Sequence, residues 1–189
     1  MERVAHCLDS LARHVSQGEV AITGSVAIGG REVADLDLVV TQRQAVAPSV
    51  GDDFLISHYH DGGKLAVQLV EPITRLRIDL FLDSLGAIAR ARPGPFGWPV
   101  VDPADLLAHK LQLLASATAA SPVAPKHADD ARALAARLGM PPPVVAPELL
   151  RNDVYATDVT ASCARCQASA DPRFRLAPKS EIFAVLGYV

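Results

Sequence analysis

The chain has 189 residues, 50% of them apolar, and a formal net charge of −3. This size and composition suffice for one substantial core with a small appendage, and the lack of a basic surplus argues against a protein that holds long nucleic acid by its backbone. The sequence has neither an apolar run of about 18 residues nor the apolar core of a secretion signal, so we expect no membrane span and no export. Three cysteines do not form a disulfide framework in such a chain, and we expect a reducing cytoplasm.

The sequence up to residue 82 predicts one helix followed by several strands. Apolar residues recur at helical spacing from Val4 to Val15, and Gly18 follows as a helix end. Alternating apolar residues then indicate strands, two of which flank the turn at 61–63 as a hairpin. The expected elements are a helix over 2–16 and strands over 19–23, 35–40, 54–60, 64–70 and 75–82.

The rest of the sequence predicts a loop, two helices and a tail. Residues 92–99 are rich in Pro and Gly and are expected to form the loop. Asp102 is a suitable N-cap and Pro103 a suitable first helical residue. We therefore predict an α/β fold, a small mixed β-sheet packed with helices. The expected helices cover residues 103–117 and 126–138. We expect a core with its C-terminal helices over 1–140, followed by a linker and tail over 141–189.

Two aspartates in the second strand predict a metal site. Asp35 and Asp37 are two residues apart, so their carboxylates project from the same face of the strand. Carboxylates this close repel each other unless a cation lies between them. Mg²⁺ prefers such oxygen ligands together with phosphate oxygens. Asp79, on another strand, can supply a third carboxylate, and three carboxylates with two ions form a clamp suited to phosphoryl chemistry.

Gly24 and Ser25 directly follow the first strand and predict a phosphate contact. Because Gly24 has no side chain, the backbone there can approach a phosphate closely, and the Ser25 hydroxyl adds a donor.

The order of these motifs resembles the DNA polymerase beta-like nucleotidyltransferase superfamily. The matching segments are Ile22-Thr23-Gly24-Ser25, then Asp35-Leu36-Asp37-Leu38, and later Ile78-Asp79-Leu80. Residues 102–111, which read Asp-Pro-Ala-Asp-Leu-Leu-Ala-His-Lys-Leu, and residues 125–130 resemble helices of minimal bacterial nucleotidyltransferases, including the abortive-infection toxin type. The resemblance covers about residues 19–139 and does not extend to the tail.

The resemblance implies a nucleotidyltransferase fold and a reaction. A nucleoside monophosphate would move from an NTP to an acceptor hydroxyl with release of pyrophosphate. Asp35, Asp37 and Asp79 would hold two Mg²⁺ or Mn²⁺ ions, and Asp79 would take the proton of the hydroxyl. Gly24, Ser25 and Lys110 would bind the nucleotide. Lys110 also borders an apolar helix stripe, which suggests either a snorkelling side chain or one that faces a buried anion.

Other functions remain open at this stage. The chain is alternatively a non-catalytic module of the same fold that binds nucleotide or a protein partner, as in a toxin–antitoxin pair. A nucleic-acid-binding protein with an incidental metal site is disfavoured by the net charge. The sequence does not distinguish a small molecule, a tRNA or a protein hydroxyl as the acceptor, because acceptor choice depends on loops and appended segments.

Several polar residues have a structural interpretation beside a functional one. Asp83 competes with Asp79 for the third carboxylate, but its position favours a cap for the segment that follows. Arg77 shares the face of Asp79 and suits either a carboxylate or a phosphate. Lys126 and Asp130 are interpreted as a surface helix start.

The histidines and cysteines that remain give weaker signals. His58 and His60 alternate on a strand and are interpreted as surface residues in preference to metal ligands. Cys163 and Cys166 form a Cys-x-x-Cys segment without a second cysteine pair, so unligated thiols are favoured over a zinc site or a redox pair. Cys7, a histidine or a second subunit could complete a zinc site.

Overall fold

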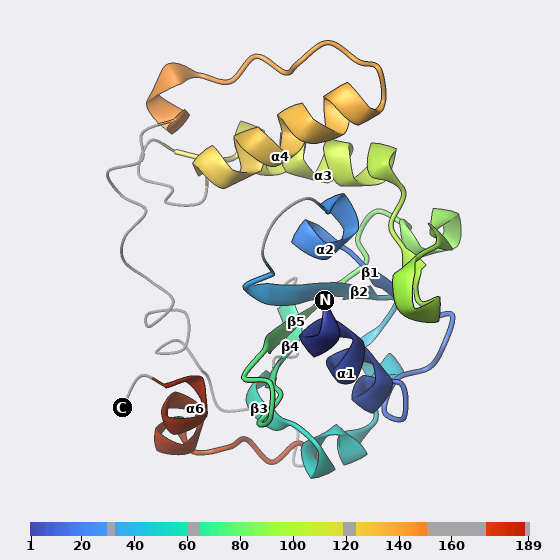
Figure 1. Ribbon diagram of the computed structural model, residues 1–189, viewed down its shortest axis with the longest axis vertical. Coiled ribbons are helices and arrows are strands. Elements are labelled where there is room, and N and C mark those ends of the chain that lie inside the picture. The colour runs from blue at the N-terminus through green and yellow to red at the C-terminus, as the bar shows by residue number, and fades with distance from the viewer. Residues whose placement is uncertain (30–32, 60–64, 119–123, 151–172, 188–189) are drawn as a thin grey trace. The chain divides into compact units, whose positions relative to one another are not determined.

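A computed structural model describes residues 1–29, 33–59, 65–118, 124–150 and 173–187. These residues fall into two units (Figure 1), each of which is described by itself. The first unit contains the described residues of 1–101 and 173–187, and the second contains those of 102–150. The units separate between Val101 and Asp102, whereas the sequence suggested a boundary at residue 140.

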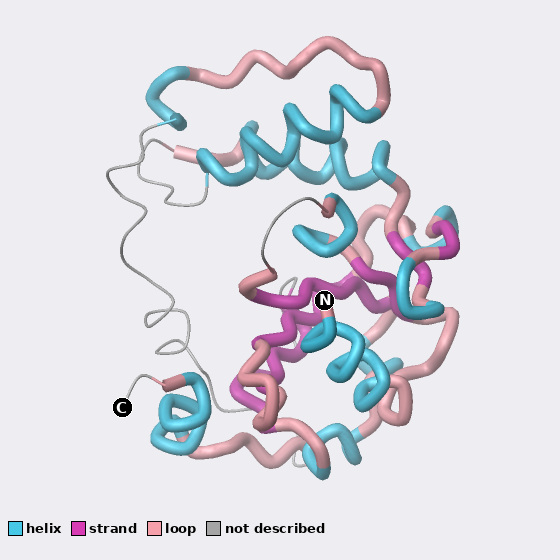
Figure 2. The backbone as a smooth tube through the Cα atoms, viewed as in Figure 1, coloured by secondary structure: helices cyan, strands magenta, loops and turns pink. Residues whose placement is uncertain are grey.

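The first unit contains a seven-stranded mixed sheet, which confirms the α/β class, and Figure 2 shows the strands grouped there. The strands are β1 (Val20–Ile22), β2 (Asp35–Val40), β3 (Leu55–Tyr59), β4 (Leu65–Val70), β5 (Arg77–Leu82), β6 (Arg92–Pro93) and β7 (Pro99–Val100). Their order across the sheet is β3-β4-β5-β2-β1-β7-β6. The pairs β2–β5 and β1–β7 are parallel, and the other neighbours are antiparallel.

The described helices are short to medium in length. The α-helices are α1 (Glu2–Leu11), α2 (Gly24–Ile28), α3 (Pro103–Ala115), α4 (Ala124–Arg137) and α6 (Lys179–Leu186). The 3-10 helices are η1 (Arg43–Ala45), η2 (Pro48–Asp52), η3 (Ile88–Arg90), η4 (Pro95–Gly97) and η5 (Pro147–Leu150). Among the described residues, none of these helices has the length and apolar character needed to span a membrane.

The core of the first unit lies between α1 and one face of the sheet (Figure 1). Leu8 and Leu11 of α1 are fully buried in the same cluster as Leu36, Leu38 and Ile78 of the two central strands. Since side chains alternate along a strand, the odd-numbered residues of β2 and β5 project from the opposite face. That face carries the aspartates.

Some boundaries differ from those expected. The first helix ends at Leu11, before residue 16. Residues 92–99 are not simply a loop, because β6 and β7 pair as a small hairpin with Pro93 opposite Pro99. Proline lacks an N–H and is found in edge strands, which explains why a Pro-rich segment still pairs at the sheet edge. Residues 24–28 form α2, which is too short for a helical period to be visible in the sequence.

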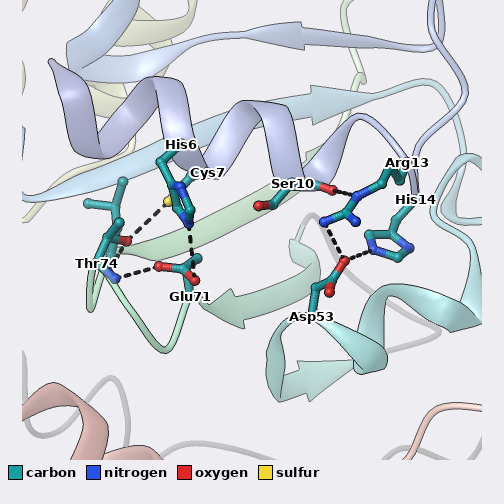
Figure 3. A network of polar contacts seen from close by, with 9 residues as sticks. His6, Cys7, Ser10, Arg13, His14, Asp53, Glu71 and Thr74 are labelled. Atoms are coloured by element: carbon teal, nitrogen blue, oxygen red, sulfur yellow. Dashed lines mark hydrogen bonds and ion pairs between the residues drawn. The ribbon is translucent and has the colours of Figure 1, made fainter.

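Polar contacts hold the middle of α1 to the turn between β4 and β5 (Figure 3). His6 Nε2 lies 3.8 Å from Glu71 Oε1, and Cys7 Sγ lies 3.3 Å from Thr74 Oγ1. Burial raises the pKa of the Cys7 thiol to about 11. Burial also tends to raise the pKa of Glu71, but hydrogen bonds from the side chain and backbone of Thr74 outweigh it and hold that pKa below 4.5.

A second set of contacts holds the segment that follows α1 to η2 (Figure 3). His14 is buried, with Nδ1 3.0 Å from Ser49 Oγ and Nε2 2.7 Å from Asp53 Oδ2. Arg13 Nη2 reaches the same oxygen at 2.9 Å. The hydrogen bond with His14, aided by the charge of Arg13, lowers the pKa of the Asp53 carboxyl.

The C-terminal segment packs on the outer strand β3. The Phe174 ring stacks on Tyr59 with centroids 3.9 Å apart, and the Ala177 N–H donates to the Ile56 carbonyl at 2.9 Å. Phe174 belongs to the main core cluster. Residues 173–187, whose structure the sequence did not predict, therefore complete the first unit.

The second unit is a pair of packed helices, α3 and α4, followed by η5. Asp102 caps α3 as expected, accepting a hydrogen bond from the Ala104 N–H at 2.8 Å, and Pro103 is its first residue. The buried apolar residues of the pair include Leu106, Leu107, Leu114, Ala128, Ala131 and Leu134.

Candidate functional site

The parallel pairing of β2 and β5 brings three aspartates together. Asp35 pairs with Arg77 and Asp37 with Asp79, so all four side chains project from the sheet face opposite α1. One carboxylate oxygen from each of Asp35, Asp37 and Asp79 lies within 4.8 Å of the other two. The three carboxylates selected from the sequence thus form one cluster.

Gly24 allows the turn after β1 to approach this cluster. Its φ is +61°, and a Cβ added there would lie 2.0 Å from Asp37 Oδ2 and 2.7 Å from Asp37 Cβ. Any larger residue would therefore collide with the aspartate. Ser25, the next residue, is 5% exposed, and its Oγ has no hydrogen-bond partner among the described residues.

Arg77 supplies a positive charge to the cluster. Its Nη2 lies 2.6 Å from Asp35 Oδ2, and its Nε lies 3.4 Å from Asp79 Oδ2. The other oxygen of Asp35, Oδ1, is buried and has no hydrogen-bond partner in the part of the chain that the structure describes. The guanidinium thus contacts the carboxylates of Asp35 and Asp79, which is one of the two roles that the sequence left open for Arg77.

A buried amide fixes the third carboxylate. Gln68 of β4 pairs with Asp79 across the sheet, and its Nε2 donates to Asp79 Oδ1 at 2.8 Å. Ser57 of β3 donates to Gln68 Oε1 at 2.8 Å and thereby fixes the amide's orientation. Neither Gln68 nor Ser57 was predicted from the sequence as a site residue. The available signal was a single amide within the otherwise apolar strand Leu65-Ala-Val-Gln-Leu-Val70.

The surroundings of Asp79 disfavour its ionised form. Burial raises the pKa of Asp79, and the nearby charge of Asp35 raises it further. The charge of Arg77 and the hydrogen bond from Gln68 act in the opposite direction but do not cancel the increase. A cation bound among the carboxylates would remove this penalty.

The residues present fit a hard divalent cation. The cluster offers carboxylate oxygens only, which suit Mg²⁺ and Mn²⁺ better than the softer metals that favour sulfur and imidazole. Two oxygens, Asp35 Oδ1 and Ser25 Oγ, are buried without a hydrogen-bond partner among the described residues, so they have unused capacity as acceptors.

Lys110 lies in the second unit, where it forms a buried ion pair. Its Nζ is 2.9 Å from Asp130 Oδ2 and 3.4 Å from His127 Nδ1. Asp130 is only 2% exposed, so its interpretation as part of a surface helix start was wrong, whereas Lys126 is half-buried. The sequence showed that Lys110 borders an apolar stripe but did not show that its partner comes from the following helix.

The other candidates have structural positions or lie outside the described residues. Asp83 accepts hydrogen bonds from the N–H groups of Leu85, Ala87 and Ile88, which confirms it as a cap for the segment that follows β5. His58 is half-buried on β3. His60, Cys163 and Cys166 lie outside the described residues.

The fold and the site define a class of protein, an α/β protein with three carboxylates gathered on adjoining parallel strands. No protein-family model matches the chain. A comparison with curated proteins likewise gives no significant match.

Proposed function

We propose that this protein is a metal-dependent nucleotidyltransferase of the DNA polymerase beta-like superfamily. It would transfer a nucleoside monophosphate from an NTP to an acceptor hydroxyl and release pyrophosphate. The observation that carries the proposal is the cluster of Asp35, Asp37 and Asp79, whose ligand atoms lie within 4.8 Å of one another. The carboxylates occur in the order and with the Gly-Ser motif that the resemblance requires.

The position of Gly24 supports the proposal independently of the carboxylates. The Gly-Ser turn and the Asp-x-Asp strand are separate in the sequence, yet Gly24 leaves no space for a Cβ beside Asp37. A merely acidic surface patch would not require a glycine at this point. The contact links the motif that would bind phosphate to the motif that would bind metal.

The three aspartates would hold two Mg²⁺ or Mn²⁺ ions, which would supply positive charge to neutralise the phosphates and would lower the pKa of the attacking hydroxyl. The Ser25 hydroxyl would donate a hydrogen bond to a phosphate oxygen. Asp79 would accept the proton of the acceptor hydroxyl. Gln68 orients Asp79 by occupying Oδ1, so that Oδ2 is the oxygen available for this chemistry.

Lys110 is proposed to assist by binding the triphosphate. This role rests on the resemblance of its helix to that of minimal nucleotidyltransferases. Asp130, at 2.9 Å, would hold the ammonium in one position. We also propose that the protein acts in the cytoplasm, where both NTP and Mg²⁺ are available.

The test is a labelling experiment with the purified protein. Each α-labelled NTP is incubated with Mg²⁺ or Mn²⁺ and separately with small-molecule, tRNA and protein fractions of a cell extract. We expect one fraction to become labelled, and Asp35→Asn, Asp37→Asn and Asp79→Asn each to abolish labelling. Asp83→Asn is the matched control, because it changes a capping carboxylate beyond the same strand and should leave labelling intact.

Two outcomes would contradict the proposal in different ways. Labelling that survives in the asparagine variants would show that the transfer site lies elsewhere. Nucleotide binding without labelling of any fraction would favour the alternative, a non-catalytic module that binds nucleotide or a protein partner.

A further inference from the structure

Arg77 extends into the carboxylate cluster. It precedes Asp79 by two residues on β5 and pairs with Asp35 on β2, so its side chain projects among the carboxylates. Nη2 is 2.6 Å from Asp35 Oδ2 and Nε is 3.4 Å from Asp79 Oδ2. The side chain is only 18% exposed, so the guanidinium belongs to the cluster and not to the solvent-facing surface.

The charges of the cluster explain why an arginine is useful there. Three ionised carboxylates carry −3, and one guanidinium brings the sum to −3 + 1 = −2. Gln68 contributes a dipole but no net charge. Arg77 therefore relieves part of the repulsion between the aspartates, and the net negative charge that remains attracts a cation.

The guanidinium and a divalent ion would compete most directly at Asp79 Oδ2, because Asp79 Oδ1 already accepts the hydrogen bond from Gln68. Mg²⁺ binds carboxylate oxygens at about 2.0–2.1 Å, and Arg77 already lies within ion-pair distance of Oδ2 of both Asp35 and Asp79. Two cations that share these oxygens would lie a few ångströms apart and repel each other. Simultaneous occupation in the present arrangement is therefore unfavourable.

We propose that Arg77 is a resident counter-cation that a divalent ion displaces from Asp35 and Asp79. The proposal rests on the metal site of the proposed function. In the metal-free protein, the guanidinium keeps the carboxylates together. When the ion binds, Arg77 gives up these contacts, so the protein binds the ion less tightly than the three carboxylates alone would. Arg77 is thus a positioning residue that sets metal affinity.

The first test compares Mn²⁺ binding by calorimetry, without nucleotide, in wild type, Arg77→Gln and Arg132→Gln. Arg132 is the matched control, because it loses the same charge from an exposed pair with Asp129 in the second unit. We expect Arg77→Gln to bind Mn²⁺ about tenfold more tightly than wild type, within the range usual for coupled ligands. Arg132→Gln should bind as wild type does.

Thermal unfolding gives a second readout on the same proteins. Without metal, Arg77→Gln should melt below wild type, because the carboxylates have lost their counter-cation. Saturating Mn²⁺ should then raise its melting temperature by more than it raises that of wild type, since the stabilisation follows the affinity for the native state.

A measurement on the unmodified chain keeps the proposal testable if Arg77→Gln does not fold. The ¹⁵N resonance of the Arg77 Nε–H group, assigned with an Arg77→Lys variant, is followed in wild type during a Mg²⁺ titration. Displacement predicts that the resonance moves in step with saturation. An unchanged resonance at saturating Mg²⁺ would overturn the proposal.

The outcomes separate this proposal from the proposed function. Equal or weaker Mn²⁺ affinity in folded Arg77→Gln, with binding intact in wild type, would overturn the displacement alone. No divalent binding by any of the proteins would overturn the displacement together with the metal site. A wild type that binds Mn²⁺ as described here but labels no acceptor would support the displacement and refute only the transferase.

Discussion

Gly24 offers the sharpest test of the site geometry, because its replacement by alanine has two separate effects. The backbone there has φ +61°, which costs a residue with a Cβ about 1–2 kcal/mol. The new Cβ would also lie 2.0 Å from Asp37 Oδ2 and 2.7 Å from Asp37 Cβ and Cγ, so the strand or the turn must move. Overpacking of this kind costs a further 1–3 kcal/mol, roughly. We therefore expect Gly24→Ala to lower the free energy of unfolding by about 2–5 kcal/mol.

Gly18 provides the matched control for Gly24. It also has a left-handed backbone, with φ +89°, but an added Cβ meets nothing within 4 Å in the described part of the chain. Gly18→Ala should therefore show only the conformational part of the loss, about 1–2 kcal/mol. Urea unfolding of both variants measures the difference.

Metal binding separates the two variants further. Because the displaced group in Gly24→Ala is the Asp37 side chain, this variant should also bind Mn²⁺ more weakly, whereas Gly18→Ala should bind it normally. Equal losses of stability in the two variants, with metal binding unchanged in both, would refute the close contact between the Gly-Ser turn and the carboxylates.

Three further changes test the buried polar groups. Gln68→Leu should lower the free energy of unfolding by about 1–3 kcal/mol, since Asp79 loses a buried hydrogen bond; urea unfolding measures it. Lys110→Met should cost about 3–5 kcal/mol by leaving Asp130 uncompensated, and adding Asp130→Leu should restore most of that stability. Glu71→Gln should be less stable than wild type at pH 7. Because the native pKa of Glu71 is lowered, this difference should disappear as pH falls below 4.5 through that pKa, in thermal unfolding measured against pH.

Each of these expectations has an opposing result. A Gln68→Leu variant with wild-type stability would mean that its amide does not satisfy Asp79. A Lys110→Met/Asp130→Leu protein no more stable than Lys110→Met would contradict the ion pair. A difference in stability between Glu71→Gln and wild type that persists unchanged at low pH would show that the loss does not arise from the carboxylate charge.

The carboxylate cluster could be predicted because strand periodicity is a local property. Asp35 and Asp37 share a face through their spacing, and Asp79 alternates with buried leucine and isoleucine on its own strand. The sequence did not show that the two strands are parallel neighbours, which is what brings the carboxylates within reach of one another. The prediction that Asp79 joins Asp35 and Asp37 came from the order of the motifs and not from their spacing.

The partners of the site residues could not be predicted, because they depend on register between strands and helices. Gln68 reaches Asp79 only through the pairing of β4 with β5, and Arg77 meets Asp35 only through the pairing of β5 with β2. Lys110 finds Asp130 on the helix that follows its own. A local pattern marks such residues as unusual in an apolar setting without identifying their partners.

The packing of residues 173–187 on β3 has a consequence for the order in which the chain folds. A chain emerges from the ribosome N-terminus first, so the sheet is complete long before Phe174 and Ala177 appear. Until then Tyr59 lacks its stacking partner and the Ile56 carbonyl lacks its donor. An outer strand with open backbone groups is a template for pairing with other chains. The nascent first unit is therefore most prone to aggregate while the second unit is being synthesised, and the final segment ends that exposure.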